Sequence, residues 1–251
     1  MINIEIFKDA VENESVLNRQ IRRDFGQNQA VSAEPDQSAY IIAGPGSGKT
    51  TVMALRVLKL IFVNNINPQK ILVTTFTRKA AAELSSRIFG WGDTLKQHFL
   101  GTIDDGDTQK WLETIDFNQI TLGTLDSITE EIIGIYREPG DTIPVVINNF
   151  TSKGLMLKVG LFEHNRHNNS ALRQYVERLY GKNPNAKDLV NALIEIKDRF
   201  YHDQINREQY LAECQNPGVE DVCRAIADYE RHLDEKLLYD YAKLESTFLN
   251  K

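Results

Sequence analysis

The chain is 251 residues long, and 41% of these residues are hydrophobic, so it can bury one large core together with a smaller one. Charged residues make up 25% and aromatic residues 9%, which excludes a disordered, collagen-like or disulfide-scaffold protein. The formal net charge of −6 excludes a general attraction for nucleic acid, so any contact with DNA has to come from a local surface.

Three strand-and-helix pairs follow one another in the first half of the chain. In each pair, a short run of apolar or β-branched residues precedes a segment in which apolar residues have helical spacing. We expect the last of these helices to begin with a capping box from Ser127 to Glu130. Strands that alternate with helices predict an α/β fold with a parallel sheet flanked by helices. The expected pairs are 39–43 with 50–65, 70–76 with 77–89, and 119–124 with 127–136.

The second half of the chain is mainly helical. The Pro and Gly residues of Arg137 to Pro144 interrupt the preceding helix. Helical patterns then cover 170–181 and 186–203, and a long one follows over 219–248. We therefore expect a mainly helical subdomain to be inserted into the α/β part.

A glycine-rich turn joins the first expected strand to its helix. Such a turn allows backbone N–H groups at a helix N-terminus to meet phosphate oxygens. In the P-loop pattern, Lys49 reaches the outer phosphates of ATP and the Thr50 hydroxyl binds Mg²⁺. The glycines alone would fit a purely structural turn, but the added Lys-Thr pair favours a nucleotide site. The expected ligands are Ala43, Gly44, Pro45, Gly46, Ser47, Gly48, Lys49, Thr50 and Thr51, with Lys49 and Thr50 as the catalytic pair.

Three further stretches carry a family resemblance. The stretch "ILVTTFTRKAAAEL", residues 71–84, resembles motif Ia of the UvrD/Rep-like superfamily 1 DNA helicases. Gln27 matches the upstream glutamine of that family, whose amide reads the adenine edge as both donor and acceptor. "GTLDS", residues 123–127, looks like motif Ib, with Leu125 and Asp126 in place of the usual Phe and His. The resemblance implies a P-loop (RecA-like) parallel sheet.

The resemblance also implies a site for single-stranded DNA after the second and third strands. Phe76 would stack on a base while neighbouring hydroxyls and cations line the strand's path. Without the motif, a buried core Phe76 would be the better interpretation. Arg78 stands where the family usually has Asn, and Thr51 stands where it often has Arg. The implied DNA contacts are Thr75, Phe76, Thr77, Arg78, Lys79, Gly123 and Thr124.

The same resemblance divides the chain into three segments. Residues 1–137 would form the ATP-binding subdomain 1A, 138–230 the helical subdomain 1B, and 231–251 a return segment to 1A. We find no apolar strand that ends in Asp-Glu, because the acidic pairs near Asp234 and Thr129 lie in helical patterns. We therefore expect the Walker B strand and the second RecA-like domain to lie beyond this chain, and the chain alone to be inactive.

The implied enzyme hydrolyses ATP with Mg²⁺, moves 3′ to 5′ along single-stranded DNA and unwinds duplex at junctions between single and double strands. A nuclease or a repair protein would be a further partner. Two other interpretations stay open. One is a naturally short, non-catalytic nucleotide- or DNA-binding module of a repair or phage-defence complex, and the other is a P-loop ATPase that acts on something other than DNA.

The remaining polar residues carry weaker predictions. Basic residues of the helical part would touch duplex DNA, although scattered charges usually lie on solvated faces. A metal site is disfavoured because His164 and His167 have no further ligands at a suitable spacing. Cys214 and Cys223 favour free thiols, and no apolar run reaches the length of a membrane span, so we expect a cytoplasmic protein without a membrane partner. The basic candidates are Lys153, Lys158, Arg166 and Arg173.

Overall fold

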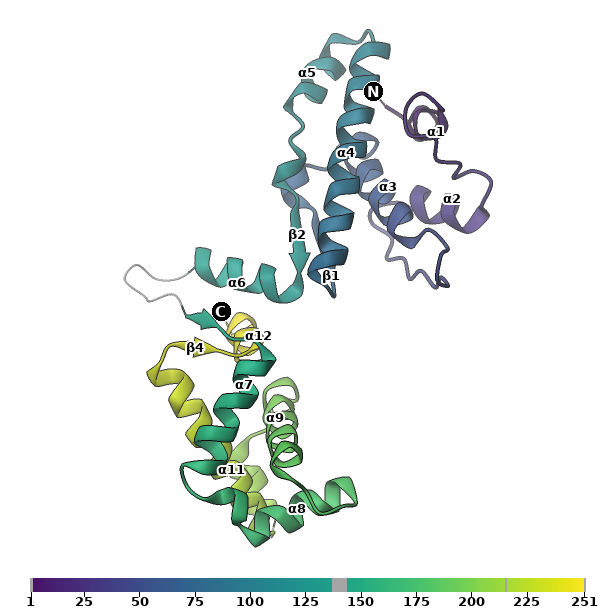
Figure 1. Ribbon diagram of the computed structural model, residues 1–251. Coiled ribbons are helices and arrows are strands. Elements are labelled where there is room, and N and C mark those ends of the chain that lie inside the picture. The colour runs from purple at the N-terminus through teal and green to yellow at the C-terminus, as the bar shows by residue number, and fades with distance from the viewer. Residues whose placement is uncertain (1, 137–143, 215, 251) are drawn as a thin grey trace. The chain divides into compact units, whose positions relative to one another are not determined.

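A computed structural model describes residues 2–136, 144–214 and 216–250 of the chain (Figure 1). The chain forms two compact units, Met1–Ile128 and Thr129–Lys251, and each unit has its own hydrophobic core. The expected domain boundary between residues 137 and 138 lies outside the described residues, as does most of the expected helix break at 137–144.

The first unit combines helices with a small parallel sheet. Strand β1 (Leu72–Thr75) pairs with strand β2 (Thr121–Thr124), and the register runs from Leu72 opposite Thr121 to Thr75 opposite Thr124. Two of the expected strands therefore form. The helical elements up to residue 128 are α1 (Ile4–Glu12), α2 (Phe25–Ser32), α3 (Lys49–Phe62), η1 (Pro68–Lys70), α4 (Arg78–Thr102), α5 (Gly106–Thr114), η2 (Phe117–Gln119) and the start of α6 (Leu125–Ile135).

Helix α4 lies along both strands of this sheet and also packs against α3 (Figure 1). Three aromatic rings hold α3, α4 and η2 together. Phe62 contacts Phe99 at 5.3 Å between ring centroids and Phe117 at 5.9 Å, both in edge-to-face geometry. All three rings are buried in the core of the unit, so α3 and α4 are joined by tight packing.

Two local predictions for this unit are wrong. Residues 39–43 form no strand, and Tyr40 and Ile42 are exposed, because no described segment pairs with this one. The capping box from Ser127 to Glu130 does not form either, since α6 already begins at Leu125. Thr124 takes the capping role instead. Its Oγ1 accepts a hydrogen bond from the Ser127 N–H at 3.2 Å.

The second unit is mainly helical, as expected. Strands β3 (Val145–Val146) and β4 (Leu238–Tyr239) form a short parallel pair beside the helices. A π-helical stretch, η3 (Met156–Phe162), continues directly from α7 and packs against α11. The other elements are α7 (Asn149–Leu155), η4 (Arg166–Asn168), α8 (Ser170–Tyr180), α9 (Ala186–His202), α10 (Arg207–Glu213), α11 (Pro217–Glu235) and α12 (Tyr241–Leu249).

The long helix expected over 219–248 is interrupted. Helix α11 ends at Glu235, and Leu237 adopts a positive φ of 53°, which turns the chain into strand β4. Asp240 then caps α12 by accepting a hydrogen bond from the Lys243 N–H. The apolar spacing continues across this break, so periodicity alone did not reveal it. Among the residues described, no helix combines the length and apolar character that crossing a membrane requires.

Candidate functional site

The glycine-rich turn lies between the exposed segment 39–43 and helix α3. Gly46 and Gly48 have φ values of +75° and +78°, in the left-handed region that an L side chain rarely adopts. Gly48 is the N-cap of α3, and no described side chain caps this helix. The first N–H groups of α3 are therefore left for an anion to bind.

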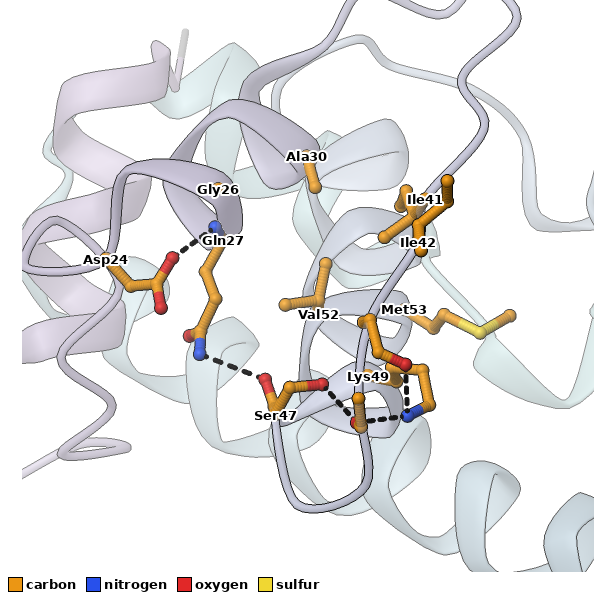
Figure 2. A pocket seen from close by; sticks show the side chains of 12 residues that line it. Asp24, Gly26, Gln27, Ala30, Ile41, Ile42, Ser47, Lys49, Val52 and Met53 are labelled. Atoms are coloured by element: carbon orange, nitrogen blue, oxygen red, sulfur yellow. Dashed lines mark hydrogen bonds between the residues drawn. The ribbon is translucent and has the colours of Figure 1, made fainter.

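The Lys49 side chain folds back onto the backbone of this turn. Its Nζ donates hydrogen bonds to the carbonyl oxygens of Ala43 at 3.1 Å and Gly44 at 2.6 Å (Figure 2). The Ser47 hydroxyl donates to the same Gly44 oxygen at 2.8 Å. A phosphate chain that reached Lys49 would take the place of these carbonyl acceptors.

A pocket of about 430 Å³ lies beside the turn, and Gln27 reaches into it. The Gln27 Nε2 donates to the Ser47 carbonyl at 3.2 Å, which ties α2 to the turn. Asp24 supports this arrangement by capping α2 through the Gln27 N–H at 2.9 Å. An amide for a base, an ammonium and free N–H groups for phosphates make a donor set that fits ATP.

The pocket also has walls that the sequence patterns did not single out. Ile41, Ile42 and Met53 supply apolar contacts, and Asp24 and Ala30 come from the segment around α2. Asp24 lies three residues before Gln27, which is the spacing of a helix cap, so its role could have been found from the sequence. The apolar walls carried no such signal, because their run was interpreted as a buried strand.

Thr50 and Thr51 occupy the first turn of α3 and are half-buried. Neither threonine is among the residues that line the pocket, and Thr51 is engaged elsewhere. Its Oγ1 accepts a hydrogen bond at 3.1 Å from Nη1 of Arg87, which comes from helix α4. Position 51 thus carries a small hydroxyl side chain, and the cation that contacts it, Arg87, comes from another helix.

A second group of predicted residues meets at the carboxyl ends of the two strands. Thr75 and Thr124 are register partners at the last positions of β1 and β2. Thr77 caps α4, because its Oγ1 accepts from the Ala80 N–H at 3.2 Å. The structure therefore brings the motif Ia and motif Ib residues together from segments about 50 positions apart.

Phe76 follows Thr75 and is 105% exposed, so the interpretation of this residue as a core aromatic is wrong. Arg78 and Lys79 follow in the first turn of α4 and are exposed as well. An aromatic ring in solvent beside two cations has the composition of a stacking platform for an unpaired base.

Gly123 lies on the other side of this site and is buried. A Cβ atom at Gly123 would come within 2.7 Å of the Ser127 Oγ and 3.2 Å of the Ile128 Cγ1, so the glycine permits α6 to start close to β2. Leu125 is exposed, and Asp126 places a carboxylate in the first turn of α6. This strand end carries a hydroxyl and an acid but no cation.

Two of the basic candidates in the second unit are committed to internal contacts. Arg166 pairs with Asp228 at 2.6 Å, and Arg173 donates to the carbonyl oxygens of His167 at 3.1 Å and Pro184 at 2.5 Å. Lys153 and Lys158 are exposed.

The two histidines considered for a metal have other surroundings. His164 lies 3.4 Å from the Asp228 carboxylate through Nε2, and the His167 ring packs against Phe162 with 4.3 Å between ring centroids.

The acidic pairs lie in helices as expected, with Glu130 in α6 and Asp234 in α11.

Comparison with known proteins matches residues 24–251 to the family model of the UvrD/REP helicase N-terminal domain. The chain is 32% identical over 138 residues to ATP-dependent DNA helicase SRS2 of Saccharomyces cerevisiae, across 49% of this chain and 12% of that protein. It is 47% identical over 62 residues to DNA helicase II of Escherichia coli, across 25% of this chain and 8% of that protein. It is 48% identical over 62 residues to ATP-dependent DNA helicase UvrD1 of Mycobacterium leprae, across 25% and 8%. The chain thus aligns with about a tenth of the length of these relatives.

Proposed function

The chain belongs to the UvrD/REP helicase N-terminal domain family, and from this we propose that it is the ATP- and DNA-binding front part of an ATP-dependent 3′-to-5′ DNA helicase. The whole enzyme would move along single-stranded DNA and unwind duplex at junctions. Bound ATP with Mg²⁺ would supply the phosphoanhydride bond whose hydrolysis drives this movement.

The exposed Phe76 at the ends of two parallel strands is the observation that carries the proposal. The Phe76 ring is fully exposed to solvent and so does not pack in the core of this unit, whereas in bound single-stranded DNA a base would stack on it. Thr75, Thr124 and the cations of Arg78 and Lys79 would hold the adjacent backbone, and Gly123 would keep α6 close. The other residue of motif Ia, Thr77, orients α4 through its cap.

For the nucleotide, Lys49 would release the loop carbonyls and bind the outer phosphates. Thr50 would bind Mg²⁺, Gln27 would bind the adenine edge, and residues 43–48 would surround the phosphates through their backbone. The positive φ angles of Gly46 and Gly48 and the pocket beside Gln27 support this assignment.

We assign residues 1–137 to a RecA-like subdomain, 138–230 to a helical subdomain and 231–251 to a segment that returns to the first. The acidic Walker B strand and a second RecA-like domain would come from beyond these residues, so the 251-residue chain should bind ATP weakly and hydrolyse little of it.

Two binding measurements on the chain test this proposal. Fluorescence anisotropy with a labelled oligo(dT) strand should show binding that Phe76→Ala weakens by about 1 to 3 kcal/mol, the range for one stacked base. Phe150→Ala is the matched control, because Phe150 is 88% exposed but belongs to the helical unit. Titration with a fluorescent ATP analogue should show binding that Lys49→Ala removes.

The proposal is wrong about DNA if Phe76→Ala and Phe150→Ala bind the strand as well as the parent chain. Robust DNA-stimulated ATP hydrolysis by the 251-residue chain would contradict the proposed need for further catalytic segments.

A further inference from the structure

Helix α4 connects the two candidate sites of the first unit. Its N-terminal end carries Arg78 and Lys79 of the DNA site, and Arg87, about two turns farther along, contacts Thr51 in the nucleotide helix α3. Thr51 directly follows Thr50, the residue assigned to Mg²⁺. A single hydrogen bond thus joins the helix of one site to the first turn of the helix of the other.

The Arg87 side chain is held in one orientation by three different partners. Its Nη2 donates to the Glu83 carboxylate at 2.6 Å, one helical turn away on α4, while Nη1 donates to Thr51. The guanidinium also lies over the Trp91 ring, 5.8 Å from its centroid. A planar guanidinium with two separate N–H acceptors is more restricted than a single ammonium would be.

A residue of the N-terminal segment, Arg19, contacts the same tryptophan ring. Arg19 lies over the Trp91 ring at 5.2 Å, so this ring interacts with two guanidinium groups. Arg19 itself belongs to the residues before position 24, which the family model does not cover. The contact of Arg87 with Thr51 is therefore built into a packed set of residues and is not an isolated surface bond.

Building on the proposed function, we propose that Arg87 is a positioning residue that couples the two sites through the Thr51 hydroxyl. Single-stranded DNA bound at Phe76, Arg78 and Lys79 would fix the position of the start of α4, which Thr77 caps. Through Arg87, the helix fixed in this way would hold the first turn of α3 in the geometry that binds nucleotide phosphates. DNA should then tighten nucleotide binding, and by thermodynamic linkage the nucleotide should tighten DNA binding by the same factor.

The test measures the affinity of the chain for a fluorescent ATP analogue with and without saturating oligo(dT). For the parent chain we expect DNA to tighten nucleotide binding about fivefold or more, at the lower end of typical coupling. Thr51→Val keeps the shape of the side chain but removes the acceptor, and should reduce the effect to less than about twofold, a small part of such a coupling. Thr51→Ser restores a hydroxyl and should restore the coupling.

Thr94→Val is the matched control. Thr94 lies on the same helix, and its hydroxyl donates only to the Gly90 carbonyl at 2.8 Å within that helix, so this change should leave the coupling at the parent value. The thermal midpoint of each variant establishes that it is folded. If Thr51→Val does not fold, Arg87→Lys serves instead, since an ammonium cannot reproduce both hydrogen bonds of the guanidinium.

Direct binding of each ligand separates two kinds of failure. A parent chain that binds neither ligand overturns the proposed function and this inference with it. Binding of both ligands overturns the inference alone in either of two cases: the parent chain shows no coupling, or Thr51→Val keeps the parent value.

Discussion

Lys197 and Asp240 form an ion pair in the interior of the helical unit, where their side chains are 2% and 5% exposed. The Tyr229 hydroxyl donates to the same carboxylate at 2.8 Å, and the other carboxylate oxygen caps α12. Asp240 thereby joins α9, α11 and α12. Asp240 lies in the expected return segment 231–251, so a buried charge holds this segment against α9 and α11.

Asp240→Asn should destabilise the helical unit, because it removes the buried counter-charge of Lys197 and leaves that ammonium paired with the Asp198 carboxylate, which lies 2.9 Å away and is 37% exposed. Breaking a buried pair from one side costs about 3 to 5 kcal/mol, and the remaining pair with Asp198 should place the loss at the lower end of this range. Urea unfolding followed by circular dichroism measures it. Asp234→Asn is the control, since Asp234 pairs with Lys243 but is 70% exposed, and should cost less than about 1 kcal/mol. Equal losses in the two variants would contradict the role given to burial.

Gly218 allows α11 to approach α8 closely, and its replacement should separate the two helices. A Cβ atom at Gly218 would lie 2.5 Å from the Ala171 carbonyl oxygen and 2.5 Å from the Tyr175 Cβ. Since backbone cannot move aside cheaply, Gly218→Ala should cost about 1 to 3 kcal/mol. The thermal midpoint of unfolding measures this change.

Gly154→Ala provides the comparison for this prediction. Gly154 lies in helix α7 of the same unit, and a Cβ atom there has no described neighbour within 4 Å. Alanine should stabilise that helix by about 0.5 to 1 kcal/mol because it restricts the unfolded chain. A destabilised Gly154→Ala variant would show that alanine itself, and not the close approach, causes the loss at Gly218.

The sequence predicted the elements whose signals are local. The glycine turn, the strands at 72–75 and 121–124, and helices α8 and α9 follow from spacing and residue type within one segment. The prediction of a strand at 39–43 was wrong, because a strand also needs a second strand to pair with, and this pairing depends on residues elsewhere in the chain. The break in the helix at Leu237 was not predicted, because the apolar periodicity continues across the turn that the positive φ of this residue creates.

In the candidate site, too, the sequence predicted local features but not contacts between distant segments. Motif spacing indicated Lys49, Gln27 and Phe76, but it could not indicate Arg87, whose partner Thr51 lies 36 positions earlier. Such a contact depends on how α4 packs against α3. The exposure of Phe76 was likewise undecided by its residue type, since most phenylalanines are buried.

Arg22 should make the stability of the first unit depend on pH. Its guanidinium pairs with Glu5 at 2.8 Å, Asp9 at 2.9 Å and Glu12 at 3.0 Å, which fixes the segment before Gln27 to helix α1. The hydrogen bond from Arg22 holds the pKa of Glu5 below its ordinary value of 4.5. Burial would raise the pKa of Glu12, but hydrogen bonds from the Arg22 backbone and side chain lower it overall.

A carboxyl group whose pKa is lower in the folded state stabilises that state above its unfolded pKa. This contribution is lost as pH falls through 4.5 and then through the folded value. Arg22→Gln should therefore lower the thermal midpoint at pH 7, and its difference from the parent chain should shrink toward pH 3. Arg23→Gln, at the exposed neighbouring position, should show no such pH dependence. A difference for Arg22→Gln that stays constant with pH would refute the role of these carboxylates.

Asp126 should weaken the binding of DNA at the strand ends. It lies two residues after Thr124, which is the register partner of Thr75, so its carboxylate is close to the path proposed for the phosphate backbone. Asp126→Asn removes one negative charge there and should strengthen binding to oligo(dT). Asp126 is half-buried, and the gain should still be largest at low salt, because its repulsion of the phosphates is screened as ionic strength rises.

Asp107→Asn is the matched control for this last change. Asp107 also lies in the first turn of a helix, but α5 is at the opposite end of the first unit from the carboxyl ends of the strands (Figure 1). Removing its charge should alter oligo(dT) binding much less at moderate salt, because salt screens charges that are far from the proposed DNA path more fully than charges beside it. Anisotropy titrations of both variants between low and moderate salt decide the matter. If Asp126→Asn and Asp107→Asn strengthen binding equally, net charge alone is responsible and Asp126 has no special position on the DNA path.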